Sequence, residues 1–148
     1  MKKEESGMIR MMEEKDLDQV AAVWLSGNKE AHPFVPKQYW EENLPEVKKQ
    51  FLQAEIFVYE EEQAVRGFAG LQGDYLAGIF VEQKFRSRGI GKRLLDEVKK
   101  THPKLTLHVY RKNKGAAAFY EREGFRIAGE GVDEATGEVE YTMSYTRK

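Results

Sequence analysis

Apolar residues recur along the chain with two different spacings, and these predict an alternation of helices and strands. Residues 17–28 carry apolar side chains about every third or fourth position, which is the spacing of a helix that packs one face on a core. Asp16 precedes this helix as its expected N-cap, and Gln19 follows three residues later in the pattern of a capping box. Helical spacing resumes over residues 37–53, where Pro45 is expected to begin a second helical segment.

Shorter apolar or alternating runs predict strands. The expected strands are residues 8–13, 56–59, 65–71, 75–81, 105–110, 125–130 and 138–145. The run 75–81 is apolar almost throughout, so it is expected to be a central strand that is buried on both faces. An amphipathic helix follows it, and a helix between two strands predicts a right-handed crossover that pairs strands 75–81 and 105–110 in parallel.

The elements are expected to form one domain of the α/β class. A chain of 148 residues can bury a core without disulfides or a metal, so the expected domain spans residues 1–148, with residues 1–7 disordered. The predicted order is one strand, two helices, three strands, a helix, a strand, a helix over residues 116–123, and two strands. With antiparallel neighbours and one parallel pair, this order predicts a mixed sheet.

A glycine-containing turn lies between the central strand and its helix. Residues 86–92 read Arg-Ser-Arg-Gly-Ile-Gly-Lys, and the apolar face of the helix begins at Ile90. Backbone N–H groups at a helix start favour an anion, and glycine lets a phosphate approach them closely. The spacing matches neither the P-loop nor the dinucleotide-binding pattern. The sequence therefore predicts a seat for a pyrophosphate that belongs to neither class of nucleotide site.

Charge is distributed unevenly along the chain. Between Lys84 and Lys114 there are eleven Lys or Arg residues against Asp96 and Glu97, a local balance of +9 in a chain whose net charge is −1. This asymmetry predicts an anionic ligand beside the segment. The basic residues do not form one run and lack interleaved aromatic residues, so a phosphate-rich small molecule is favoured over nucleic acid.

The turn resembles the acetyl-CoA motif of the GNAT superfamily of acetyltransferases. The motif, Gln or Arg, two residues, Gly, one residue, then Gly or Ala, is matched by Arg86, Gly89 and Gly91. Asn113, residues 116–121 and the Gly124-Phe125 pair follow at the interval of the family, so the resemblance covers residues 75–127. It implies the GNAT fold, with about six or seven strands, four helices and a parallel pair of central strands.

The resemblance also implies how acetyl-CoA is held. The two central strands splay apart in the family, and the pantetheine arm of the cosubstrate lies in the opening. Main-chain groups of Ile79, Phe80 and Val81 are then expected to bind the arm, and an amide near this point could stabilise the oxyanion that forms on attack. The residues expected around the pyrophosphate, together with Arg86, are Ser87, Arg88, Gly89, Ile90, Gly91 and Lys92.

Transfer of an acyl group from a thioester to an amine requires two proton movements. Tyr120 matches the tyrosine that many GNAT enzymes place beside the CoA sulfur, so it is the expected acid; packing as a core aromatic is its alternative role. His108 matches the position of a glutamate in some relatives, and its usual pKa of about 6.5 suits a base. His108 could equally be a partly exposed strand residue whose side chain only keeps the walls of the cleft apart. Asn113 is expected to hydrogen-bond the arm or to order the next loop.

The acceptor side is less determined by the sequence. His32 and Phe34 lie in a loop with two prolines, where His32 could contact the acceptor or anchor the loop. The chain has no cysteine, so the amine is expected to attack directly in a ternary complex. Candidate acceptors are a protein lysine, an N-terminal amine or a small amine, and the alternative function is a catalytically silent acyl-CoA-binding regulator.

Several further properties are expected. We expect no metal site, nucleic-acid partner or membrane association, and either a monomer or a homodimer. The charged residues 1–7 lack the apolar stretch of a signal peptide, which favours a cytoplasmic protein.

Overall fold

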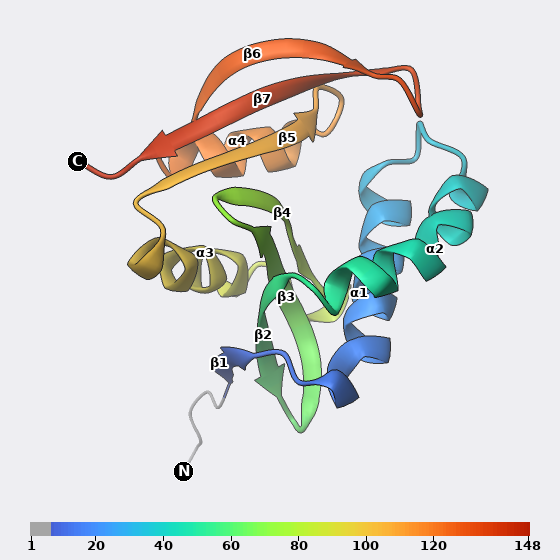
Figure 1. Cartoon of the computed structure of the whole chain (residues 1–148), viewed down its shortest axis with the longest axis vertical. Coiled ribbons are helices and arrows are strands. Elements are labelled where there is room, and N and C mark those ends of the chain that lie inside the picture. Colours follow the sequence, from blue (N-terminus) through green and yellow to red (C-terminus); the bar gives the residue numbers. More distant parts are fainter. Residues whose placement is uncertain (1–6) are drawn as a thin grey trace.

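The computed structural model describes residues 7–148, which form a seven-stranded mixed sheet with helices on both faces (Figure 1). The strands are β1 (Met8–Met11), β2 (Glu55–Glu61), β3 (Ala64–Gln72), β4 (Tyr75–Val81), β5 (Lys104–Tyr110), β6 (Arg126–Asp133) and β7 (Glu138–Thr146). The helices are α1 (Leu17–Ala31), α2 (Lys37–Phe51), α3 (Ile90–Thr101) and α4 (Lys114–Arg122), with short 3₁₀ turns η1 (Glu14–Asp16) and η2 (Gln83–Phe85). The α/β class, the order of the elements and the GNAT-type arrangement are as expected.

The strands follow one another in the sheet as β1-β2-β3-β4-β5-β7-β6. Neighbouring strands run antiparallel except β4 and β5, which run parallel as the crossover through α3 predicts. The sheet separates the apolar residues into two cores because side chains alternate along a strand. On β2, Ile56 and Val58 pack with α1 and α2, whereas Phe57 and Tyr59 join the larger core under α3 and α4.

The two central strands part soon after they begin. Tyr75 and Thr106 are the registered pair between β4 and β5, and the amide of Thr106 donates to the carbonyl of Asp74 at 3.0 Å. Beyond this point the strands diverge, and Figure 1 shows β5, β7 and β6 turning away from the other half of the sheet. The expectation that β4 is buried on both faces is wrong, because Leu76 alone in this strand is fully buried. Beyond its first residue, β4 borders an opening on the side of β5, where a fully paired strand would otherwise lie.

Proline does not interrupt the second helix as expected. α2 runs from Lys37 to Phe51 as one helix with Pro45 inside it. The proline removes one helical hydrogen bond, but the buried side chains of Trp40 before it and Phe51 after it hold both parts of the helix against the core.

The expected capping box at the start of the first helix is also wrong. The Asp16 carboxylate accepts hydrogen bonds from the Glu13 amide at 2.7 Å and from the Arg10 guanidinium at 2.8 Å. The Gln19 side-chain oxygen accepts from the amide of Val65 on β3 at 2.9 Å. Asp16 occupies the N-cap position of α1 as expected, but its carboxylate forms a capping box with Glu13 on the 3₁₀ turn η1 and does not bond the amides of α1. Both side chains therefore join the start of α1 to the sheet.

The expectation of disorder in residues 1–7 falls, for residues 1–6, outside the described residues. The carbonyl of Gly7 accepts a hydrogen bond from Arg93 of α3 at 3.3 Å. Within residues 7–148, no helix combines the length and apolar character needed to cross a membrane.

Candidate active site

A cavity of about 630 Å³ occupies the opening between β4 and β5. Its walls come from β4 and β5, from the start of α3, from α4, and from α1 and α2 on the other face of the sheet. Helices from both faces thus reach one space because the splayed strands leave the sheet open there. A cavity of this size is in the range of small-molecule sites.

One end of the cavity lies at the start of α3. Gly89 caps the helix with a φ of 80°, a left-handed conformation that favours glycine, and Ser87 shares it with a φ of 65°. The first helical hydrogen bond runs from the Arg93 amide to the Gly89 carbonyl. The amides of Ile90, Gly91 and Lys92 therefore lack helical acceptors and form the positive end of the helix.

Gly91 leaves room beside these amides. A Cβ atom at this position would lie 3.7 Å from the Phe119 ring and 3.9 Å from Ile79, which is ordinary contact. The fold itself would therefore tolerate a small side chain at Gly91. What the glycine provides is open access to the helix start from the cavity.

The basic side chains of the turn are held by carboxylates of the protein itself. Arg86 donates to the Val81 carbonyl at 2.9 Å and to the Glu30 carboxylate of α1 at 2.6 Å. Lys92 lies 3.2 Å from the Glu123 carboxylate and 3.3 Å from that of Asp96.

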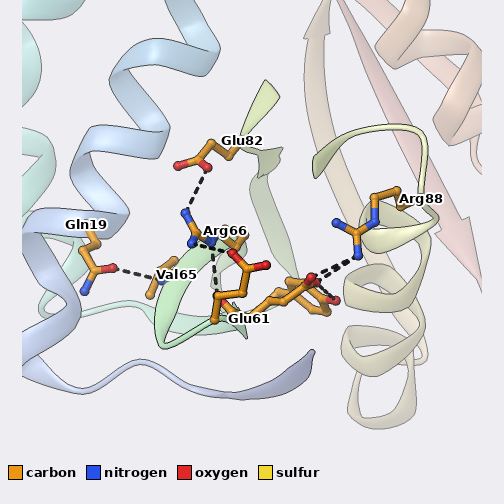
Figure 2. A network of polar contacts seen from close by, with 8 residues as sticks. Gln19, Glu61, Val65, Arg66, Glu82 and Arg88 are labelled. Carbon is orange, nitrogen blue, oxygen red and sulfur yellow. Dashed lines mark hydrogen bonds and ion pairs between the residues drawn. The ribbon is translucent and has the colours of Figure 1, made fainter. Parts of the chain in front are cut away.

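Arg88 points away from the cavity toward the end of β2. Its guanidinium lies 3.1 Å from the Glu61 carboxylate, a contact drawn in Figure 2. Arg66 donates to the Glu61 carbonyl and to the Glu82 carboxylate. The hydrogen bond from the Tyr59 hydroxyl, with Arg88, lowers the pKa of the buried Glu61 carboxyl, and the bond to Glu61 raises the pKa of Arg88. The ion pair therefore stays charged and anchors the turn.

Tyr120 of α4 reaches the cavity from the larger core. Its side chain is 7% exposed, and its ring packs edge-on against Phe119 and Phe125. Burial raises the pKa of Tyr120 above its usual value, and the nearby backbone of Ile79 acts in the opposite direction. The hydroxyl consequently keeps its proton at neutral pH and is able to donate it, from a position beside β4.

His108 lies on β5, exposed to the same cavity. Its Nδ1 atom is 3.3 Å from the hydroxyl oxygen of Tyr75 at the start of β4. Burial is the main cause that raises the pKa of Tyr75, and the negative charge of Glu140 raises it further. The Tyr75 hydroxyl therefore keeps its proton, and its oxygen can accept a hydrogen bond from the Nδ1–H of His108, which is the tautomer that leaves Nε2 free.

His32 is buried in an aromatic cluster at the other side of the cavity. Its ring packs against Trp40 and edge-on against Phe34 and Tyr110, with centroids 4.9 to 5.6 Å away. Burial lowers the pKa of His32 to about 4, so the ring is neutral near pH 7. The loop is thereby anchored, and the ring still forms part of the cavity wall.

Asn113 joins this cluster to α4. Its side-chain oxygen accepts from the Ala116 amide at 3.2 Å, which makes it the N-cap of the helix. This fixes the amide nitrogen toward Nε2 of His32, 3.1 Å away. Since the Asn113 nitrogen donates, Nε2 of His32 accepts, and the residue orders the loop before α4.

The structure brings together most of the residues expected from the sequence. Those that line the cavity are Ile79, Phe80, Val81, Arg86, Gly91, Asn113, His32, His108 and Tyr120. The expected residues outside its lining are Ser87, Arg88, Gly89, Ile90, Lys92 and Phe34, of which Ile90 is buried in the core. Residues that the sequence analysis did not select also line it, notably Trp40, Tyr75, Tyr110 and Glu140. In residues 7–148, no group of three His, Asp or Glu side chains is arranged to hold a metal ion.

Comparison with known proteins identifies the fold family. Residues 53–127 match the family described as the acetyltransferase (GNAT) domain. The chain belongs to the GNAT family of acetyltransferases. As a GNAT protein it is an acetyl-CoA-dependent N-acetyltransferase.

Individual GNAT proteins resemble the chain over most of its length. Peptidyl-lysine N-acetyltransferase YiaC of Escherichia coli (strain K12) is 38% identical over 122 residues, which span 81% of this chain and 84% of that protein. The solution structure of apo-form YjaB from Escherichia coli has a TM-score of 0.83 at 24% identity and covers 97% of this chain and 100% of that one. The PaiA N-acetyltransferase from Thermoplasma acidophilum, solved in complex with coenzyme A, has a TM-score of 0.80 at 20% identity, with 96% and 99% covered.

Proposed function

We propose that this GNAT protein transfers the acetyl group of acetyl-CoA to the side-chain amine of lysine in a peptide or protein. The observation that carries the proposal is the single cavity that joins the start of α3 to a polar and aromatic end formed by β5, α1 and α2. One end suits the phosphates of the cosubstrate and the other suits an amine on an alkyl stem. The peptidyl-lysine specificity named for YiaC, at 38% identity, supports the choice of acceptor.

The cosubstrate fits the anion seat through the backbone. The free amides at the start of α3 would bind the pyrophosphate, with Gly91 leaving the approach open. The arm would then run along β4, beside the main chain of Ile79, Phe80 and Val81, which line the cavity on the side of the missing strand partner. This route brings the thioester toward Tyr120.

Two residues of the cavity then carry out the proton transfers, one at the amine and one at the sulfur. The acceptor arrives as an ammonium ion. His108 donates its Nδ1–H to the hydroxyl oxygen of Tyr75, so its free Nε2 atom accepts a proton from the ammonium directly or through a water. The free amine attacks the thioester carbonyl, and the C–S bond breaks as the tetrahedral species collapses. Tyr120 donates its proton to the departing sulfur, and the second proton that the attacking nitrogen has to lose returns to Tyr120 through water.

A panel of acceptors tests the proposal. We expect release of CoA thiol from acetyl-CoA with a lysine peptide whose N-terminus is blocked, and mass spectrometry should place the acetyl group on lysine. A peptide with a free N-terminus and no lysine, and a polyamine, are the comparison acceptors. Turnover of either comparison acceptor without turnover of the lysine peptide would reject the assignment to lysine.

A further inference from the structure

The cavity is electrically polarised along its length. At one end lies the start of α3, whose free amides suit an anion, beside Arg86, whose guanidinium is paired with Glu30. Among the described residues that line the cavity there is one carboxylate, that of Glu140 on β7. A site built to receive both an anionic cosubstrate and a cationic amine needs this separation of charge.

The register of the sheet places Glu140 on the acceptor side. Glu140 is paired with Tyr110 across β5 and β7, and Thr142 is paired with His108. Cross-strand partners lie on the same face of a sheet, and Val109 between the two β5 residues belongs to the core under α3 and α4. Glu140 therefore lies on the face toward α1 and α2, together with His108 and Tyr110.

Neighbouring carboxylates are already engaged, but that of Glu140 is not. Glu138 lies 3.2 Å from Lys112, Glu130 lies 3.7 Å from Arg111, and Asp133 accepts from the Tyr110 hydroxyl at 2.7 Å. Within residues 7–148, Glu140 has no ion pair or hydrogen-bonded side chain, although it is only partly exposed. A partly buried carboxylate is stabilised when a cation joins it.

The surroundings of Glu140 suit a cation on an alkyl stem. The rings of His32, Trp40 and Tyr110 line the same cavity and offer apolar surface and aromatic faces. Burial keeps His32 uncharged near pH 7, so this wall adds no positive charge that would repel an ammonium group. The Trp40 Nε1–H group is buried and has no hydrogen-bond partner among the described residues, so this wall has a free hydrogen-bond donor.

We infer that the Glu140 carboxylate is the counter-ion that binds the ammonium group of the acceptor, with the aromatic wall packing against its methylene stem. The inference rests on the proposed function and names the residue that selects a lysine-like acceptor. Glu140 acts in binding, so no bond forms or breaks at this residue. Proton removal stays with His108.

Kinetics with Glu140→Gln test the inference. With a lysine peptide at saturating acetyl-CoA, we expect KM for the peptide to rise at least about tenfold, the effect of losing one hydrogen bond to a charged group. The dissociation constant of CoA, measured by calorimetry, should stay unchanged, which also shows that the variant is folded. Glu140→Asp retains the charge and should recover part of the affinity.

The matched control is Glu130→Gln, which removes the same charge from an exposed position on the adjacent strand β6. It should leave KM unchanged. A peptide with norleucine in place of lysine has the stem without the charge. It should bind the wild-type protein at least about tenfold more weakly than the lysine peptide does. Its affinity for Glu140→Gln should equal its affinity for the wild-type protein.

The outcomes separate the two claims. An unchanged KM in Glu140→Gln, with an active wild-type protein, would overturn the role of Glu140 and leave lysine acetylation standing. If the wild-type protein turned over no amine, the proposed function would fail, and the preference for lysine over norleucine, read from tryptophan fluorescence with CoA present, would still decide the role of Glu140.

Discussion

Replacing Tyr120 by phenylalanine separates a catalytic hydroxyl from a core aromatic ring. The substitution deletes one oxygen from a side chain that is 7% exposed and keeps the ring packed on Phe119 and Phe125. Removal of the hydroxyl should lower the free energy of unfolding by no more than about 1 kcal/mol, the size of one typical net hydrogen bond. Loss of a general acid should lower kcat at least about tenfold, which corresponds to about 1.4 kcal/mol of activation free energy.

Thiol release at saturating acetyl-CoA and lysine peptide measures kcat, and urea unfolding measures stability. The matched control is Tyr145→Phe, because the rings of Tyr120 and Tyr145 each lie 5.4 Å from Phe125 but the Tyr145 side chain does not line the cavity. We expect the control to keep its kcat. If Tyr120→Phe lost stability and retained the wild-type kcat, Tyr120 would be a core residue and the mechanism would need another acid.

Three other predictions concern the anion seat, the core and the aromatic wall. Gly91→Glu should abolish CoA binding in calorimetry with little change in thermal unfolding, since a Cβ there meets Phe119 only at 3.7 Å; retained affinity would show that the seat lies elsewhere. Leu94→Ala, at a fully buried position, should lower the free energy of unfolding in urea by about 2 to 5 kcal/mol, and a cost near zero would contradict its place in the core. Because burial lowers the pKa of His32 to about 4, below its value of about 6.5 in the unfolded chain, stability should fall as the pH drops from 6.5 to 4. His32→Phe should flatten that part of the urea-derived pH profile, and an unchanged slope would show that another group is responsible.

The parts of the fold that the sequence predicted well are those that local patterns determine. The apolar spacing of Ile90, Leu94, Leu95 and Val98 identified the buried face of α3, and all four side chains are buried. The bounds of β4 also agree with its apolar run. By contrast, the role of Gln19 depended on a distant partner, the Val65 amide, that no local pattern specifies. Pro45 stays within one helix because buried residues on both sides of it hold α2 against the core.

The residues on the proposed acceptor side of the cavity could not be predicted from the sequence for the same reason. Glu140 is one of several glutamates in a hairpin of alternating residues, and only the register that pairs it with Tyr110 shows which face it occupies. Tyr75 lies beside His108 because it belongs to the single registered pair between β4 and β5, and this pairing is a property of the folded sheet. The proposed anion seat, in contrast, was predicted from consecutive residues of the turn alone.

The ion pairs of the motif turn clarify how the seat is built. Arg86, Arg88 and Lys92 pair with carboxylates on α1, at the end of β2 and just after α4. The Arg86–Glu30 pair is exposed on both sides and contributes only about 0 to 1 kcal/mol of stability. Together the three pairs hold the turn against three separate elements. Arg86 also donates to the carbonyl of Val81, where β4 ends. The same side chain therefore fixes the strand proposed to carry the arm and connects it to Glu30 on the helix that borders the acceptor side.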